Sequence, residues 1–171
     1  MKYLFLRAAS LLLLAGCQQQ QAGEYTPTYV YREGYSARLV HGKAVIPKKA
    51  PINIKRVIAA GNKIVGRPYR RGGGHRRHHD SGYDCSGSVS YVLHEAGMLS
   101  WTKVPTSSDF SRWGRPGYGK WLTVYTKPGH VFLIVAGLRF DTTGSGRGVG
   151  PRWYTSSRHS HGFQVRHIPG F

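Results

Sequence analysis

Cys85 stands in the string Asp84-Cys85-Ser86-Gly87, a setting that suits a nucleophilic thiol. Asp84 is a good N-cap, and the apolar spacing that follows predicts a helix beginning at Cys85. The free N–H groups and the dipole at a helix start stabilise a thiolate. The small residues Ser86 and Gly87 leave this helix start open to a substrate, and the Cys85 backbone N–H is placed to stabilise an oxyanion. Cys85 is therefore our candidate nucleophile.

A thiol nucleophile needs a base, and nine histidines compete for that role. His130 differs from the others because it opens an apolar run that ends at Val135, and a strand end holds an imidazole rigidly. Spacing alone does not separate it from a surface histidine that begins a strand, but it is our candidate base. The other histidines are His41, His75, His78, His79, His94, His159, His161 and His167.

Asp141 is the candidate for the group that orients this imidazole. It stands eleven positions after His130, across a turn expected at Ala136-Gly137, so a hairpin would bring the two side chains together. In a Cys-His-Asp arrangement we expect Asp141 to accept the Nδ1 hydrogen of His130, leaving Nε2 for the thiol proton. Asp80 would be the next aspartate to consider.

The elements that must position these residues follow from periodicity. A helix is expected from Pro51, with Val57, Ile58 and Gly61 on its apolar face, ending at Gly66. A loop over 67–83 leads to the helix of Cys85, which Gly97 ends. Strands are expected at 121–125, 130–135, 138–141 and 164–168, with loops over 142–162. This order predicts an α+β domain with a mostly antiparallel sheet.

Together these residues resemble the NlpC-type peptidoglycan endopeptidases. The resemblance covers roughly 52–143 and rests on Pro68-Tyr69, Asp84-Cys85-Ser86-Gly87 and Gly129-His130-Val131 in that order. It implies a papain-like fold and hydrolysis of a γ-D-glutamyl bond to a diamino acid. It also implies catalytic roles for Cys85, His130 and Asp141, and substrate contacts for Tyr69, Asp84 and Ser86. We expect no cofactor.

Two departures place the chain in a divergent branch of that family. The orienting position, often histidine in the family, is here Asp141. The stretch before His130 lacks the usual Gly-Asp-Leu-Val string and has Trp121-Leu122-Thr123-Val124-Tyr125 instead. An aspartate can stabilise an imidazolium, so we expect activity.

The N-terminus has the pattern of an export signal. Lys2 and Arg7 precede a short apolar stretch, and Leu14-Ala15-Gly16-Cys17 resembles the bacterial lipobox. We expect residues 1–16 to be removed and Cys17 to be lipidated, anchoring the protein in the envelope, at the outer membrane facing the periplasm in a Gram-negative host. Residues 17–50 would be a tether with one possible strand near 39–46, and 51–171 the peptidase domain. Lipidation of Cys17 would leave Cys85 as a lone thiol.

The formal charge of +18 favours an anionic partner. Export argues against nucleic acid and favours the polyanions of the cell wall, with stem peptides as the expected partner; the sequence leaves the oligomeric state open. Two rival functions remain: a glycan–peptide amidase, and a non-catalytic wall-binding lipoprotein using its tryptophans. We expect no metal site, because His75, His78 and His79 have no acidic or cysteine ligand at a suitable spacing.

Overall fold

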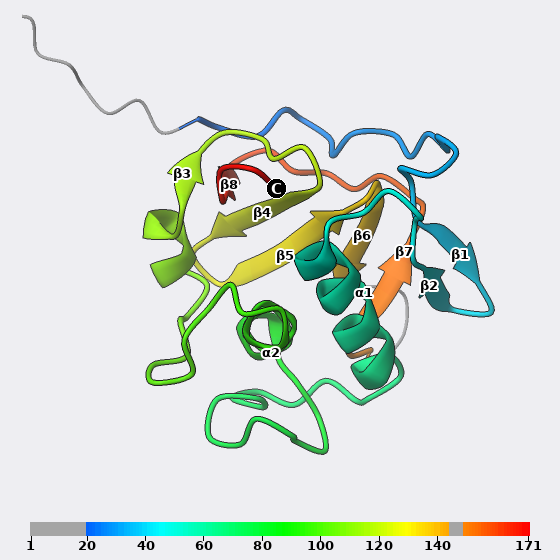
Figure 1. Ribbon diagram of the computed structural model, residues 1–171. Coiled ribbons are helices and arrows are strands. Elements are labelled where there is room, and N and C mark those ends of the chain that lie inside the picture. Colours follow the sequence, from blue (N-terminus) through cyan, green and yellow to red (C-terminus); the bar gives the residue numbers. More distant parts are fainter. Residues whose placement is uncertain (1–19, 144–148) are drawn as a thin grey trace, which may run out of the picture.

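The computed structural model describes residues 20–143 and 149–171, so the predicted signal peptide and Cys17 lie outside the described residues. Two helices cover one face of a six-stranded sheet, and a small two-stranded sheet lies beside them (Figure 1). The α+β prediction is confirmed. The elements are β1 (Arg38–Val40), β2 (Lys43–Val45), α1 (Ile52–Ile64), α2 (Cys85–Glu95), the 3-10 helix η1 (Asp109–Arg112), β3 (Arg115–Pro116), β4 (Leu122–Lys127), β5 (His130–Val135), β6 (Leu138–Asp141), β7 (Arg152–Tyr154) and β8 (Gln164–His167).

The sheet has the strand order β3-β8-β4-β5-β6-β7, and every neighbouring pair in it is antiparallel. β5 is central and nearly all apolar, as its sequence predicts. Strand alternation points Val131, Leu133 and Val135 into the main core beneath the helices. Phe132 lies in a second cluster of buried residues, and Ile134 packs against that cluster. Apolar packing on both faces holds the first residue of β5, His130, in a defined place.

Both helices begin and end close to the predicted positions. Pro51 is the N-cap residue of α1, and Asp84 is the N-cap of α2 with its side chain accepting a hydrogen bond from the backbone of Gly87. Gly97 follows α2 with a φ of 69°, the left-handed conformation that commonly ends a helix. Asn62 of α1 accepts from the backbone N–H of Ala44, 2.9 Å, and thereby fastens β2 to the helix.

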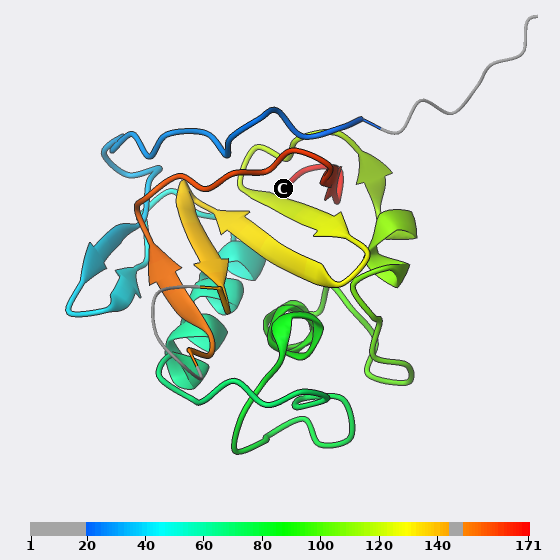
Figure 2. The same ribbon diagram turned by 180° about the vertical axis from the view of Figure 1, so that it is seen from behind.

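The segment before α1 is packed, whereas the sequence predicts a tether. From residue 20 it runs beside the chain that leads into β8, as both views show (Figure 2). Backbone hydrogen bonds join Ala22 to Phe163 and Thr26 to Arg158, at 2.7 and 2.9 Å. The single strand expected near 39–46 is a hairpin of β1 and β2, and Ala37 and Ala44 are buried in the main core. The pairings of Ala22 and Thr26 join residues more than a hundred positions apart, which local pattern does not reveal.

Short elements were also missed near the sheet edges. The stretch expected to be all loop contains β7, which pairs with β6 and buries Trp153. β3 and η1 precede the central strands and were not expected. Elements of two to four residues are too short to show a period in the sequence. Within 20–143 and 149–171, no helix is both long and apolar enough to cross a membrane.

Candidate active site

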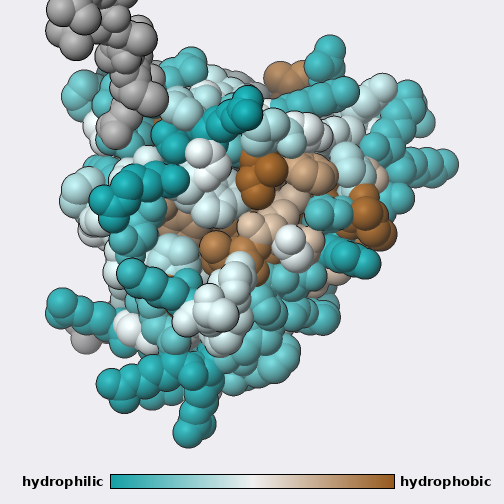
Figure 3. All heavy atoms as spheres, turned by 60° about the vertical axis from the view of Figure 1, so that its left-hand side comes forward, coloured by the Kyte–Doolittle hydropathy of each residue, from teal (hydrophilic) through white to brown (hydrophobic). Residues whose placement is uncertain are grey.

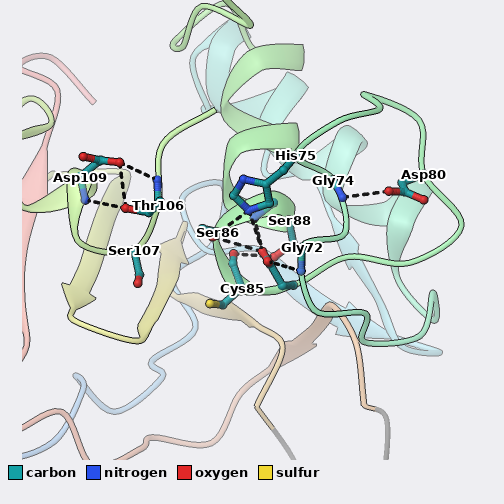
Figure 4. A network of polar contacts seen from close by, with 12 residues as sticks. Gly72, Gly74, His75, Asp80, Cys85, Ser86, Ser88, Thr106, Ser107 and Asp109 are labelled. Carbon is teal, nitrogen blue, oxygen red and sulfur yellow. Dashed lines mark hydrogen bonds and ion pairs between the residues drawn. The ribbon is translucent and has the colours of Figure 1, made fainter. Parts of the chain in front are cut away.

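Cys85 is the first residue of α2, and it is a free cysteine that is largely buried, with 8% of the residue exposed. Its position follows from Asp84, whose Oδ1 accepts from the Gly87 N–H at 2.7 Å and so defines the helix start. Figure 4 shows the Cys85 sulfur pointing away from the polar contacts of His75. The first N–H groups of a helix have no partner within it, which leaves the Cys85 N–H for a developing oxyanion.

A loop clamp holds this helix start in place. Asp84 Oδ2 accepts from the Gly72 N–H at 2.9 Å, while Oδ1 lies 3.1 Å from His75 Nε2. His75 Nε2 is also 3.0 Å from Ser86 Oγ (Figure 4). The hydrogen bond with Asp84 is the main cause that raises the pKa of His75. Residues on both sides of the nucleophile are therefore tied to the preceding loop.

Gly87 explains why the string after Cys85 must contain a glycine. A Cβ built on Gly87 would collide with the carbonyl oxygen of Gly73. The group that this Cβ would meet is a backbone carbonyl and not the end of a flexible side chain, so it cannot simply move aside. The loop therefore reaches the first turn of α2 only because this residue has no side chain.

His130 and Asp141 meet across the hairpin of β5 and β6. Ala136 and Gly137 form its two-residue turn, both with positive φ, at 47° and 87°, as a type I′ turn requires. Across such a turn opposed residues differ by an odd number, as Leu133 and Phe140 do. The spacing of eleven residues therefore keeps His130 and Asp141 on one face. Their side chains are 3.0 Å apart.

The ring nitrogen that contacts Asp141 is Nε2, so the predicted tautomer is wrong. We expected Nδ1 to face the carboxylate, but the 3.0 Å contact joins His130 Nε2 and Asp141 Oδ1. An unprotonated Nε2 would oppose its lone pair to the carboxylate, so the proton belongs on Nε2. Nδ1 is the nitrogen left to exchange a proton with the thiol. The direction in which the side chain enters the site decided this, and spacing carries no such information.

Asp141 is buried, and two arginines that the sequence pattern does not single out balance its charge. Arg158 Nη1 donates to Asp141 Oδ2 at 2.6 Å, and Arg139 Nε lies 3.5 Å from the same oxygen. The Thr143 N–H donates to Oδ1 at 3.0 Å. Burial acts to raise the pKa of Asp141, but the His130 hydrogen bond, the His130 and Arg158 charges and the Thr143 N–H together lower it. The carboxylate is therefore ionised and held in one orientation.

His130 interacts with both partners expected of a catalytic base. Burial acts to lower its pKa, but the hydrogen bonds with Asp141 and with Cys85, and the charges of both groups, raise it above the usual value. An imidazolium stabilised in this way stabilises a neighbouring thiolate in return. The arrangement is suited to a thiolate–imidazolium pair that attacks a carbonyl and then protonates the leaving group.

The residues expected to contact substrate occupy different environments. Tyr69 is 42% exposed, and its pKa is raised by burial and then by the nearby charges of Cys85 and Asp84. It is thus placed beside the nucleophile. Asp84 and Ser86 are buried, and their side chains bond to each other at 3.1 Å and to His75. Substrate contact by these two residues stays a prediction, and their observed contacts are with the protein.

Arg158 and His75 contact the site residues directly, and sequence reasoning did not assign either of them to the site. Arg158 follows a glycine-rich stretch without periodicity, and His75 stands among arginines in a loop. Arg158 also stacks its guanidinium over Phe132, 4.8 Å from the ring centroid, and over Phe163 at 5.5 Å. The order Gly74-His75 before Asp84-Cys85-Ser86 is a local signal for His75, because a histidine that follows a glycine turn in this loop can contact the N-cap aspartate of the next helix.

Comparisons with known proteins find likeness only in structure. No protein-family model matches the sequence, and no curated protein matches it. Three similar solved structures are mutated forms of the Resuscitation Promoting Factor Interacting protein RipA. Their TM-scores are 0.47, 0.48 and 0.46, at 21%, 23% and 20% identity. The alignments cover 78%, 78% and 77% of this chain and 72%, 71% and 73% of those chains. Our assignment of function therefore rests on the residues of the site.

Proposed function

We propose that this chain is a cysteine peptidase of the cell envelope that hydrolyses peptide bonds in peptidoglycan stem peptides. The observation that carries the proposal is a free thiol at a helix start, interacting with an imidazole that a buried carboxylate orients. Cys85, His130 and Asp141 supply these groups from α2, β5 and β6. Nucleophile, base and orienting group in this order are what acyl transfer through a thioester requires.

The proposed reaction uses only groups of the chain and water. The Cys85 thiolate attacks the scissile carbonyl carbon, and the Cys85 N–H stabilises the oxyanion. His130 then gives the Nδ1 proton to the leaving amine as the C–N bond breaks. A water molecule, deprotonated at the same Nδ1, attacks the thioester and releases the acid and the thiol. Asp141 holds Nε2–H throughout, so His130 can change its charge without turning.

The substrate class is supported by motif and charge. The Asp84-Cys85-Ser86-Gly87 and Gly129-His130-Val131 strings resemble those of NlpC-type enzymes, which act on the γ-D-glutamyl bond to a diamino acid. A surface hollow of the loop before α2 is lined by Arg70, Arg71, Arg76 and Arg77. Gly72 also lines it, and its N–H donates to Asp84 beside the nucleophile. Stem peptides carry carboxylates that suit such a surface. On the face drawn in Figure 3, hydrophilic side chains surround a smaller apolar area.

The deciding experiment is digestion of defined muropeptides by the purified protein, with product masses read and Cys85→Ala as the control. Cleavage between D-glutamate and the diamino acid is the expected result. Release of intact peptide from the glycan would make the chain an amidase. Binding to wall without any Cys85-dependent product would make it a wall-binding protein and overturn the proposal.

The envelope location is a separate part of the proposal and rests on Leu14-Ala15-Gly16-Cys17. Cys17→Ser should abolish lipidation and release a soluble or unprocessed form, measured by membrane fractionation and intact mass. Unchanged fractionation and unchanged mass of the variant would contradict anchoring through Cys17, whatever the outcome of the digestion.

A further inference from the structure

Three side chains with metal-binding atoms converge at the end of α2 opposite Cys85. His78 comes from the loop before the helix, and His94 and Glu95 come from its last turn. One ligand atom from each lies within 4.8 Å of the others. The sequence offered His78 no acidic partner nearby, but the fold brings Glu95 to it. Because α2 has eleven residues, this cluster lies about 15 Å along the helix from the nucleophile.

The contacts within the cluster leave binding capacity unused. His78 Nε2 lies 2.7 Å from Glu95 Oε1, and the ring centroids of His78 and His94 are 4.5 Å apart. The Nδ1 atoms of His78 and His94 are buried and have no hydrogen-bond partner among the described residues. A His78–Glu95 ion pair alone would not need His94. The third side chain therefore points to a ligand that all three share.

The surroundings resemble the supporting shell of a metal site. Trp101 packs edge-on against both imidazoles, with centroids 4.5 and 5.3 Å away, and the ring of Tyr91 also packs against His78, with centroids 4.8 Å apart. Lys63 Nζ lies 3.3 Å from Glu95 Oε2, so it orients the carboxylate and leaves Oε1 turned toward His78. A residue that orients a ligating carboxylate, as Lys63 does here, is typical of protein metal sites.

We propose that His78, His94 and Glu95 bind a divalent transition metal ion, zinc being the ion that two imidazoles and one carboxylate suit. Three protein ligands leave a fourth position for water. Ligand atoms about 2.1 Å from a tetrahedral ion are roughly 3.4 Å apart. Binding of the ion therefore replaces the hydrogen bond between His78 and Glu95 and moves these two ligand atoms slightly apart. The ion fastens the loop before α2 to the far end of that helix. The same loop holds Asp84 through Gly72 and His75.

The test uses the purified protein carrying Cys17→Ser and Cys85→Ala, so that no thiol competes for the metal. After treatment with EDTA, calorimetric titration with Zn²⁺ should show one tight site per chain. Saturating Zn²⁺ should raise the melting temperature by several degrees. Co²⁺ should give the intense visible absorption of a four-coordinate ion. Because this protein lacks Cys85, the result is independent of peptidase activity.

Single substitutions in that protein identify the ligands. His94→Ala and Glu95→Gln should each weaken Zn²⁺ binding at least tenfold, while His79→Ala, an exposed neighbouring histidine, should leave it within about twofold. Far-UV circular dichroism without metal checks that the variants are folded. Failure of the parent protein to bind Zn²⁺, or binding that survives both His94→Ala and Glu95→Gln, would overturn the proposal.

Discussion

His130 and Asp141 are joined by a 3.0 Å contact between Nε2 and Oδ1, which leaves Nδ1 of His130 for the thiol of Cys85. The carboxylate is fully buried and is held from its other side by Arg158. The imidazole thus has one nitrogen committed to the protein interior and one available for chemistry. This division of the two nitrogens underlies three of the predictions below.

Removal of the Asp141 carboxylate should lower turnover strongly. Asp141→Ala deprives His130 of its acceptor at Nε2, so the ring can turn and change tautomer. We expect kcat to fall on the order of ten- to a thousandfold, less than in serine enzymes because a thiol ionises more readily. Steady-state hydrolysis of a muropeptide measures this, with circular dichroism as the check on folding. Turnover near that of the wild type would mean that another residue orients His130.

The alkaline limit of activity should depend on the charge of Asp141. The pKa of His130 is raised, so the imidazolium persists above its usual range and is lost as pH rises through the raised pKa. Asp141→Asn removes a charge that raises this pKa but leaves the burial that lowers it. The alkaline limb of kcat/KM should therefore move to lower pH. An unchanged limb in the Asn variant would show that it reports a group other than His130.

Arg158 should act as a positioning residue for Asp141. Arg158→Met keeps much of the stem over Phe132 but removes the donor that holds Asp141 Oδ2. We expect kcat to fall about ten- to a hundredfold with KM nearly unchanged, a loss comparable to that of other residues that orient a reacting group. Arg158→Lys should restore part of kcat, because an ammonium can still reach the carboxylate. Equal losses in the Met and Lys variants, or a loss in KM alone, would argue against this role.

Gly87→Ala should destabilise the protein, because the added Cβ meets the Gly73 carbonyl. Overpacking between two backbone segments costs about 1–3 kcal/mol of unfolding free energy. Gly23→Ala is the matched control, because its Cβ meets only ordinary van der Waals contact at 3.7 Å. Urea unfolding of both variants measures the difference. Equal stability of the two would mean that the loop shifts away from α2 without cost.

The arginine hollow should make activity sensitive to salt. Exposed charges are screened over about 10 Å at 0.1 M ionic strength, so attraction of an anionic stem peptide weakens as salt is added. We expect kcat/KM to fall with rising salt for a substrate with free carboxylates. A substrate with amidated carboxylates is the control and should give a flat profile. The same profile for both substrates would show that these arginines are only solvated.

The local features of the active site are present in the sequence. A capping aspartate, a thiol at the first helical position and an apolar run after His130 are each encoded within a few residues. The spacing of the apolar residues around them predicts the helices and strands that carry them. The two-residue turn makes eleven positions a same-face spacing, so even the pairing of His130 with Asp141 is a local property of one hairpin.

Contacts between distant segments were decided only by the tertiary structure. The choice of Nε2 over Nδ1 depends on the angle at which Asp141 reaches the ring, and Arg158 and Glu95 reach their partners from other parts of the chain. The pairing of Ala22 with Phe163 likewise turns a polar, aperiodic segment into part of the domain. Such contacts arise from how apolar faces pack, and side chains at their borders meet without any regular spacing in the sequence.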